Sequence, residues 1–323
     1  MAKQSIQKEA AFTATMPNGM EIKYEAVAHT YDIRRPLDGG GGEGLMSEWR
    51  RVDVSMSSVA DVLDKPGLKF WGQNVGVDGM IHLWKTGQVR SVQVDGTLTQ
   101  ILLAWSEEAN DWVPCDYEVV KALLTKNKLS VNHVKEAAGG RGNSVHAALE
   151  DWIETGKMPN PEVFPIEEAG YVEGLVKFLT DLGEVKSKPQ SEVVVGSYEH
   201  NIAGRFDMIA VLHDSRFITK RATPKWTGAD TDHHSAKGPE YTTFSGRTLF
   251  DLKTSKGIYT SHKIQMRGYA LCMPECGMPS PAHVLVVQVG NDGSYLVGSA
   301  DSVTEEDFLV TLDLNRRMQR IES

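Results

Sequence analysis

The pattern of hydrophobic and polar residues changes character near residue 190. Before that point, most of residues 55–183 has helical spacing, including the LTQILLAW segment that begins at Leu98. After it, short β-branched runs predict strands, and two amphipathic segments beginning at Ser261 and Thr304 predict helices. The strand-like runs are SEVVVGSY from Ser191, AGRFDMIAVL from Ala203, TLFDLKT from Thr248, AHVLVVQV from Ala282 and SYLVGSA from Ser294.

The order of these segments predicts the fold class. A helix, three strands, a helix, two strands and a final helix are typical of an α/β protein. We therefore expect a mixed central β-sheet flanked by helices, with a mostly helical N-terminal part that also holds one or two strands in residues 20–33. The expected domains are residues 1–130, packed on the core, and the core itself, residues 131–323. Residues 214–248 show little periodicity and are expected to form an inserted loop.

Composition and charge narrow the classes of function. The net charge of −9 argues against a non-specific polyanion binder, so a nucleic-acid enzyme of this composition would need local basic patches and bound cations. The three cysteines do not predict a disulfide framework and cannot supply the four thiolates of an iron–sulfur cluster. No apolar run approaches the roughly 20 residues of a membrane helix, and the N-terminus lacks a secretory apolar core. We expect a cytoplasmic protein without a membrane partner.

Acidic residues on the predicted strands are the strongest chemical signal. Asp251 and Lys253 are two residues apart on one strand, so their side chains project from the same face. Asp207 lies on the preceding strand. Two carboxylates can hold Mg²⁺, which prefers oxygen ligands, and a neighbouring ammonium group can stabilise negative charge. This combination suits the hydrolysis of a phosphodiester bond.

Each candidate residue taken alone also has an ordinary explanation. Asp251 and Lys253 fit a solvated pair on an exposed strand, and Glu192 fits a surface acid at a strand end. His146, in a helix expected to start at Gly142 and Asn143, fits a packed or exposed histidine. Gln265 and Tyr269, spaced i, i+4, fit an amphipathic helix. The order of all these residues along the chain is therefore more informative than any one of them.

Basic and aromatic residues mark the expected loop as a candidate contact for nucleic acid. Aromatic rings can stack on bases while cations bind phosphates. The DTDHH segment from Asp230 could form a second metal site, but it also fits a polar loop tip. The candidate DNA contacts are Lys220, Arg221, Lys225 and Trp226 in the loop, and Arg205 on the strand before it.

These motifs, in this order, resemble the RecB-like branch of the PD-(D/E)XK nuclease superfamily, which includes many bacteriophage exonucleases. The resemblance covers roughly residues 139–290, and the upstream segment MSSVADVLDKPGLKFWG is similar to the opening of phage members. It implies a restriction-endonuclease-like fold. The sequence departs from the family in its longer spacing between Asp207 and Asp251, and it leaves open whether the inserted loop covers the site.

The resemblance also implies a role for each site residue. His146, Asp207 and Asp251, with the backbone carbonyl of Leu252, would bind Mg²⁺, for which Mn²⁺ can substitute. Lys253 would be the catalytic lysine and Glu192 would support the metal site. Gln265 and Tyr269 would form the QxxxY motif, which is thought to contact DNA and steady the site.

We therefore expect a Mg²⁺-dependent DNA exonuclease that hydrolyses linear DNA in phage-type recombination, replication or repair. The implied protein partner is a single-strand annealing or recombination protein. Two alternatives remain open. One is a structure-specific endonuclease of the same fold, and the other is a non-catalytic DNA-binding module.

Overall fold

The computed structural model describes residues 11–26, 28–37, 45–63, 66–93, 100–222 and 237–322. The chain divides into two compact units. The larger unit combines residues 1–63 with residues 144–323, and the smaller unit spans residues 64–143. This division differs from the boundary expected near residue 130. The N-terminal strands belong to the same unit as the core because their apolar side chains join its hydrophobic interior.

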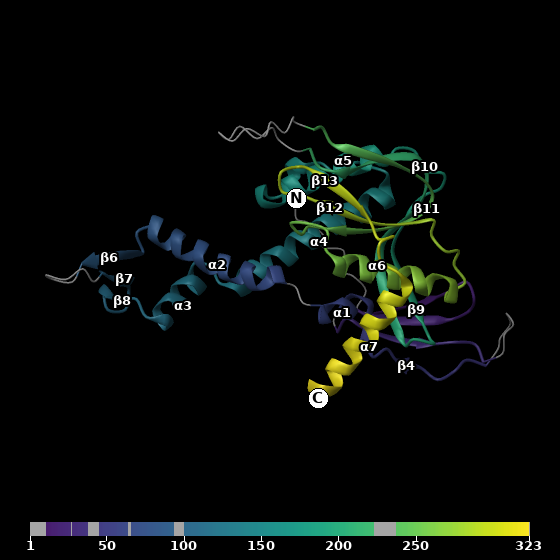
Figure 1. Ribbon diagram of the computed structural model, residues 1–323, viewed down its shortest axis with the longest axis horizontal. Coiled ribbons are helices and arrows are strands. Elements are labelled where there is room, and N and C mark those ends of the chain that lie inside the picture. Colours follow the sequence, from purple (N-terminus) through teal and green to yellow (C-terminus); the bar gives the residue numbers. More distant parts are fainter. Residues whose placement is uncertain are drawn as a thin grey trace, which may run out of the picture. The chain divides into compact units, whose positions relative to one another are not determined.

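A mixed six-stranded sheet forms the centre of the larger unit (Figure 1). The strand order is β13-β12-β11-β10-β5, and β9 also pairs with β10. Strands β11 and β12 are parallel, whereas β10 is antiparallel to both β9 and β11. The expected α/β class with a mixed sheet is therefore confirmed. The strands are β5 (Val54–Ser55), β9 (Gln190–Ser197), β10 (Ile202–Lys220), β11 (Glu240–Lys253), β12 (His283–Val289) and β13 (Tyr295–Ser299).

Helices cover both faces of this sheet because successive strand residues point to opposite sides. Leu249 and Val286 belong to one hydrophobic core, whereas Phe250 and Val287 belong to the other. The first core includes side chains of α6 and α7 and of the N-terminal strands, and the second includes side chains of α4 and α5. The helices are α1 (Met56–Val59), η1 (Ala60–Val62), α4 (Val131–Thr155), η2 (Pro161–Val163), α5 (Ile166–Leu182), α6 (Thr260–Glu275) and α7 (Glu305–Glu322).

The expected order of a helix, three strands, a helix, two strands and a helix is confirmed by α5 to α7. A second sheet, with the order β1-β2-β3-β4, precedes it in the larger unit. Its strands are β1 (Ala11–Thr15), β2 (Glu21–Glu25), β3 (Thr30–Arg34) and β4 (Arg50–Arg51). No described helix combines the length and apolar character needed to cross a membrane.

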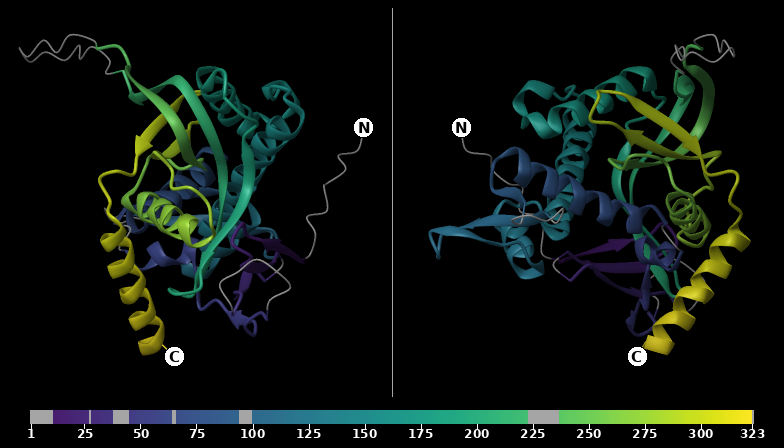
Figure 2. Two further views of the ribbon diagram at one scale, coloured as in Figure 1. Left: turned by 90° about the vertical axis from the view of Figure 1, so that its right-hand side faces the viewer. Right: turned by 60° about the vertical axis from the view of Figure 1, so that its left-hand side comes forward.

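The expected loop at residues 214–248 is wrong for the part of it that the structure describes. Strands β10 and β11 continue through it as an antiparallel ribbon, which arches at the edge of the sheet (Figure 2). A register shift between Leu212 and Ser215 bends the ribbon, where Asp214 and Gly246 have φ angles of 54° and 100°. The sequence did not reveal these strands because the segments DSRFITK and EYTTFSGR contain few apolar residues and no regular alternation. Their pairing depends on the partner strand.

Phe217 anchors the ribbon to the second core. Its ring centroid lies 5.3 Å from that of Phe178 and 6.0 Å from that of Phe250. We expect Phe217→Ala to lower the free energy of unfolding by about 3–5 kcal/mol, because it removes fully buried aromatic surface and leaves a cavity. Denaturant unfolding would measure this change. Tyr241→Ala, at an exposed ring of the same ribbon, is the control and should cost less than about 1 kcal/mol. Equal losses of stability in Phe217→Ala and Tyr241→Ala would contradict the role of Phe217 as the anchor of the ribbon.

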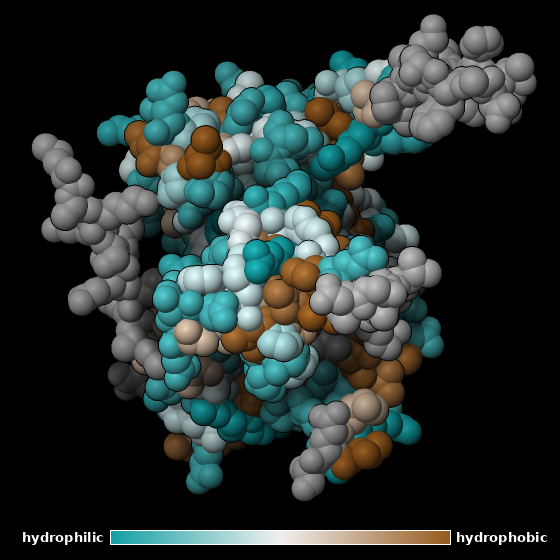
Figure 3. Space-filling model, turned by 90° about the vertical axis from the view of Figure 1, so that its left-hand side faces the viewer, coloured by the Kyte–Doolittle hydropathy of each residue, from teal (hydrophilic) through white to brown (hydrophobic). Residues whose placement is uncertain are grey.

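The smaller unit was expected to be helical, but it also contains a β-sheet. The LTQILLAW segment contributes to β7, a strand of a three-stranded sheet, because β6 and β8 supply partners on both sides. Trp105 and Trp112 face each other across β7 and β8, and such cross-strand pairs stabilise sheets. Hydrophobic side chains also gather on the surface seen in Figure 3. The elements are α2 (Pro66–Lys85), β6 (Val89–Gln93), β7 (Gln100–Ser106), β8 (Asp111–Pro114) and α3 (Tyr117–Lys126).

Candidate metal and catalytic site

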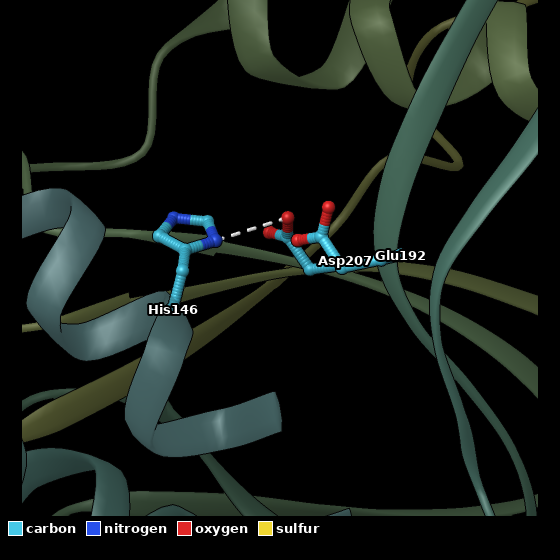
Figure 4. Close-up of side chains that lie close together, drawn as sticks. All are labelled: His146, Glu192 and Asp207. Atoms are coloured by element: carbon cyan, nitrogen blue, oxygen red, sulfur yellow. Dashed lines mark ion pairs between the residues drawn. The ribbon is translucent and has the colours of Figure 1, made fainter. Parts of the chain in front are cut away.

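Three candidate residues from separate elements converge at the central sheet. His146 comes from α4, Glu192 from β9 and Asp207 from β10, and one ligand atom of each lies within 4.8 Å of those of the other two. Figure 4 shows the imidazole directed toward the two carboxylates. The helix of His146 begins at Val131, earlier than the expected start at Gly142.

Asp207 connects the helix to both strands of the ribbon. Its Oδ1 lies 3.0 Å from Nδ1 of His146, and its Oδ2 accepts a hydrogen bond of 2.6 Å from the backbone N–H of Leu252. The pairing of β10 with β11 begins at Met208 and Phe250, so Asp207 lies where the ladder ends. Its carboxylate therefore satisfies a backbone donor that the neighbouring strand leaves open.

The charges of His146 and Asp207 stabilise each other. Burial lowers the pKa of His146, but the nearby Asp207 carboxylate outweighs burial and raises this pKa to about 9. Burial likewise raises the pKa of Asp207, but His146, Lys253 and the Leu252 N–H together hold it below its ordinary value. Near neutral pH the pair is therefore an imidazolium and a carboxylate.

Asp251 and Lys253 form a second charged pair at the end of β11. Lys253 Nζ lies 2.6 Å from Oδ2 of Asp251, and their side chains are 22% and 3% exposed, respectively. Burial, with a contribution from Asp207, raises the pKa of Asp251 to about 6 against the opposing effect of Lys253. Burial lowers the pKa of Lys253, but the two carboxylates raise it above its ordinary value. The expected ordinary explanation, a solvated pair, does not fit this burial.

Glu192 leaves the regular strand geometry just before the site. Its φ angle is 53°, which is uncommon for a residue with a side chain, and the pairing of β9 with β10 starts at the next residue, Val193. Glu192 forms an ion pair with Arg205, whose guanidinium lies 5.1 Å from the ring centroid of Tyr24. Arg205 thus orients a site carboxylate, a contact that the predicted role in DNA binding did not include.

Gln265 and Tyr269 lie on one face of α6, as their spacing predicted. The Gln265 amide donates a 2.8 Å hydrogen bond to Tyr269 Oη. Burial and the neighbouring Asp251 raise the pKa of Tyr269 well above its ordinary value, so the phenol stays neutral. Gly204 makes room for this ring, because a Cβ there would lie 2.7 Å from Tyr269 Cε1. The sequence alone did not indicate this role of Gly204.

The candidate DNA contacts have different surroundings. Lys220 pairs with Glu240, whereas Arg221 contacts Gln288 and lies near Asp292. Lys225, Trp226 and the DTDHH segment lie outside the described residues. The metal role of the Leu252 carbonyl stays a prediction.

Sequence reasoning missed two polar groups near the site. One is the N–H of Leu252, which binds Asp207, and no local signal marks it. The other is Gln288, a buried polar residue within the apolar run HVLVVQV. That interruption was a visible signal, because buried polar groups in a strand usually have a specific partner.

In comparisons with known proteins, no protein-family model and no curated protein matches this chain.

Proposed function

We propose that this chain is a Mg²⁺-dependent DNA nuclease of the PD-(D/E)XK type that acts as an exonuclease. The single observation that carries the proposal is the convergence of His146, Glu192 and Asp207 beside the buried Asp251–Lys253 pair. Buried charged groups are costly, and several in one place on an otherwise apolar sheet favour a functional site over a structural one. The resemblance of the motif order to RecB-like nucleases supports the same reaction.

The donor set fits a divalent cation. His146, Glu192 and Asp207, whose ligand atoms lie within 4.8 Å of one another, would hold it together with the neighbouring Asp251, and carboxylate oxygens suit Mg²⁺ and Mn²⁺. Metal binding would compete with the proton on His146, since only a neutral imidazole acts as a ligand. When bound, the metal would supply Lewis-acid charge and lower the pKa of a water molecule.

The protein's own groups have separate tasks in this proposal. The Lys253 ammonium, held by Asp251, stabilises negative charge that develops on the phosphate and orients the attacking water. The neutral Tyr269 phenol lies near Asp251, and the Gln265 amide fixes this phenol by its hydrogen bond. Arg205 holds the Glu192 carboxylate at the site. Fixing these charges before the substrate binds reduces the reorganisation needed during reaction.

An assay with DNA tests the proposal directly. We expect the protein to degrade end-labelled linear duplex in Mg²⁺ or Mn²⁺ and to leave it intact in EDTA. Titration calorimetry should detect Mn²⁺ binding that Asp251→Asn weakens by roughly 10- to 100-fold. A covalently closed circle should survive, and its cleavage would instead favour the endonuclease. DNA binding without hydrolysis or metal binding would favour the non-catalytic module and overturn the proposal.

A further inference from the structure

The bend in the β10–β11 ribbon returns its far end to the central sheet. After the bend, the backbone N–H of Ile218 donates a 3.2 Å hydrogen bond to Oη of Tyr295 on β13. Tyr295 is the partner of Val289, the last residue of β12. The ribbon therefore crosses one face of the sheet and ends near the carboxyl end of β12, where the left view of Figure 2 shows it arching over β13.

Arg221 follows directly after β10 and is anchored to β12. Its Nη2 donates a 2.6 Å hydrogen bond to Oε1 of Gln288, a side chain that is 2% exposed. The amide nitrogen of Gln288 donates to the carbonyl of Val289 at 2.8 Å, which fixes the orientation of the amide. The buried oxygen of Gln288 is thus held as an acceptor for the guanidinium.

Gln288 places this anchor next to the proposed catalytic lysine. Lys253 and Gln288 are partners in the parallel pairing of β11 with β12. Paired residues of neighbouring strands point to the same side of a sheet and lie about 5 Å apart. Arg221 therefore lies at the same carboxyl-terminal edge of β11 and β12 as Lys253, although the sequence separates the two residues widely.

Among the described residues, the anchor leaves much of the positive charge of Arg221 available. An amide oxygen fixes the guanidinium without neutralising it, and its only acidic partner among these residues is Asp292, in a long, solvent-exposed ion pair of 3.9 Å that binds weakly. The Arg221 side chain is 44% exposed. The neighbouring Lys220 differs, because its ammonium forms a 2.9 Å ion pair with Glu240. Although the chain has a net charge of −9, the short hydrogen bond that anchors Arg221 is accepted by a neutral amide and not by a carboxylate.

We propose that Arg221 binds a phosphate of the DNA strand adjacent to the cleaved bond, with Gln288 as its positioning residue. This inference rests on the proposed nuclease function. A guanidinium presents a planar set of donors that matches phosphate oxygens, and a fixed guanidinium loses less freedom on binding. Arg221 would position the DNA strand relative to Lys253. The β10–β11 ribbon would then be part of the DNA-binding site.

Binding of fluorescently labelled linear DNA to the full chain in EDTA tests this role without hydrolysis. We expect Arg221→Ala to weaken binding by roughly three- to tenfold and to reduce the slope of log affinity against log salt by about 0.9, the value for one lost phosphate contact. Arg216→Ala is the matched control, because Arg216 is an exposed arginine of the same strand whose guanidinium lies over the Tyr241 ring, and it should change the slope much less. Gln288→Leu keeps the charge, so it should weaken binding while leaving the slope nearly unchanged.

The outcomes separate this inference from the proposed function. If the wild type binds and degrades DNA but Arg221→Ala retains its affinity and salt slope, Arg221 serves only to fasten the ribbon and the inference is overturned. A lower melting temperature in Arg221→Ala with an unchanged slope would lead to the same conclusion. If the wild type neither degrades linear DNA with Mg²⁺ nor binds Mn²⁺, the proposed function itself fails.

Discussion

Replacing Asp207 with asparagine is expected to lower the rate of DNA hydrolysis by roughly 10³-fold, the largest effect among single substitutions in this site. Asp207 has a central position in the site, since one of its carboxylate oxygens contacts His146 and the other contacts the N–H of Leu252. Asparagine keeps the shape and an oxygen that can accept the bond from Leu252 N–H. It removes the charge that a divalent cation requires. The fold should therefore survive while metal binding and hydrolysis are lost.

The matched control for this substitution is Asp214→Asn. Asp214 lies on the same strand, β10, but its side chain is exposed, accepts a hydrogen bond from Ser245 of the ribbon and lies 3.9 Å from His213 Nδ1. Its φ angle of 54° suits asparagine. Timed digestion of labelled DNA and Mn²⁺ calorimetry should give wild-type values for Asp214→Asn. Wild-type activity in Asp207→Asn as well would show that hydrolysis occurs elsewhere.

Replacing Lys253 with methionine is expected to reduce hydrolysis by roughly 10²–10³-fold through loss of the ammonium group. The methionine keeps much of the aliphatic stem, so packing changes little. It also leaves the Asp251 carboxylate, which is 3% exposed, without its cation. Breaking a buried ion pair in this way costs up to about 3–5 kcal/mol, although the partial exposure of Lys253 reduces that cost. Activity and stability should therefore both fall.

A second substitution separates these two effects. The double variant Lys253→Met with Asp251→Asn removes the unpaired charge, so its melting temperature should recover toward the wild-type value. Its activity should stay lost, because neither the ammonium nor the second carboxylate is present. Lys256→Met, at an exposed lysine of the following loop, should match the wild type in both measurements. Recovery of activity in the double variant would assign Lys253 a purely structural role.

The arrangement of charges explains why the site needs this many residues. Asp207 and Asp251 are buried acids whose charges affect each other, and each has a basic partner, His146 and Lys253 respectively. Without a metal, these partners balance the carboxylates. The proposed cation would replace the proton of His146, while Lys253 would stay charged and face the substrate. Arg221 would add a third positive group at the same edge.

The sequence by itself determined the α/β class and the order in which helices and strands of the core follow one another along the chain. Continuous β-branched runs such as HVLVVQV favour a buried strand, and the two-residue spacing of Asp251 and Lys253 places their side chains on one face of such a strand. The i, i+4 spacing of Gln265 and Tyr269 likewise follows from helix geometry. These features depend on neighbours along the chain, so the periodicity of the sequence is sufficient to predict them.

Only the tertiary structure decided the features that depend on distant partners. The LTQILLAW segment contributes to a strand because β6 and β8 supply its hydrogen-bond partners. The described part of the expected loop forms a ribbon because β10 and β11 pair with each other there. The bond from Leu252 to Asp207 and the return of Arg221 to Gln288 have no local signature. Pairing between segments far apart in the chain is set by packing and backbone hydrogen bonding, which residue spacing alone does not encode.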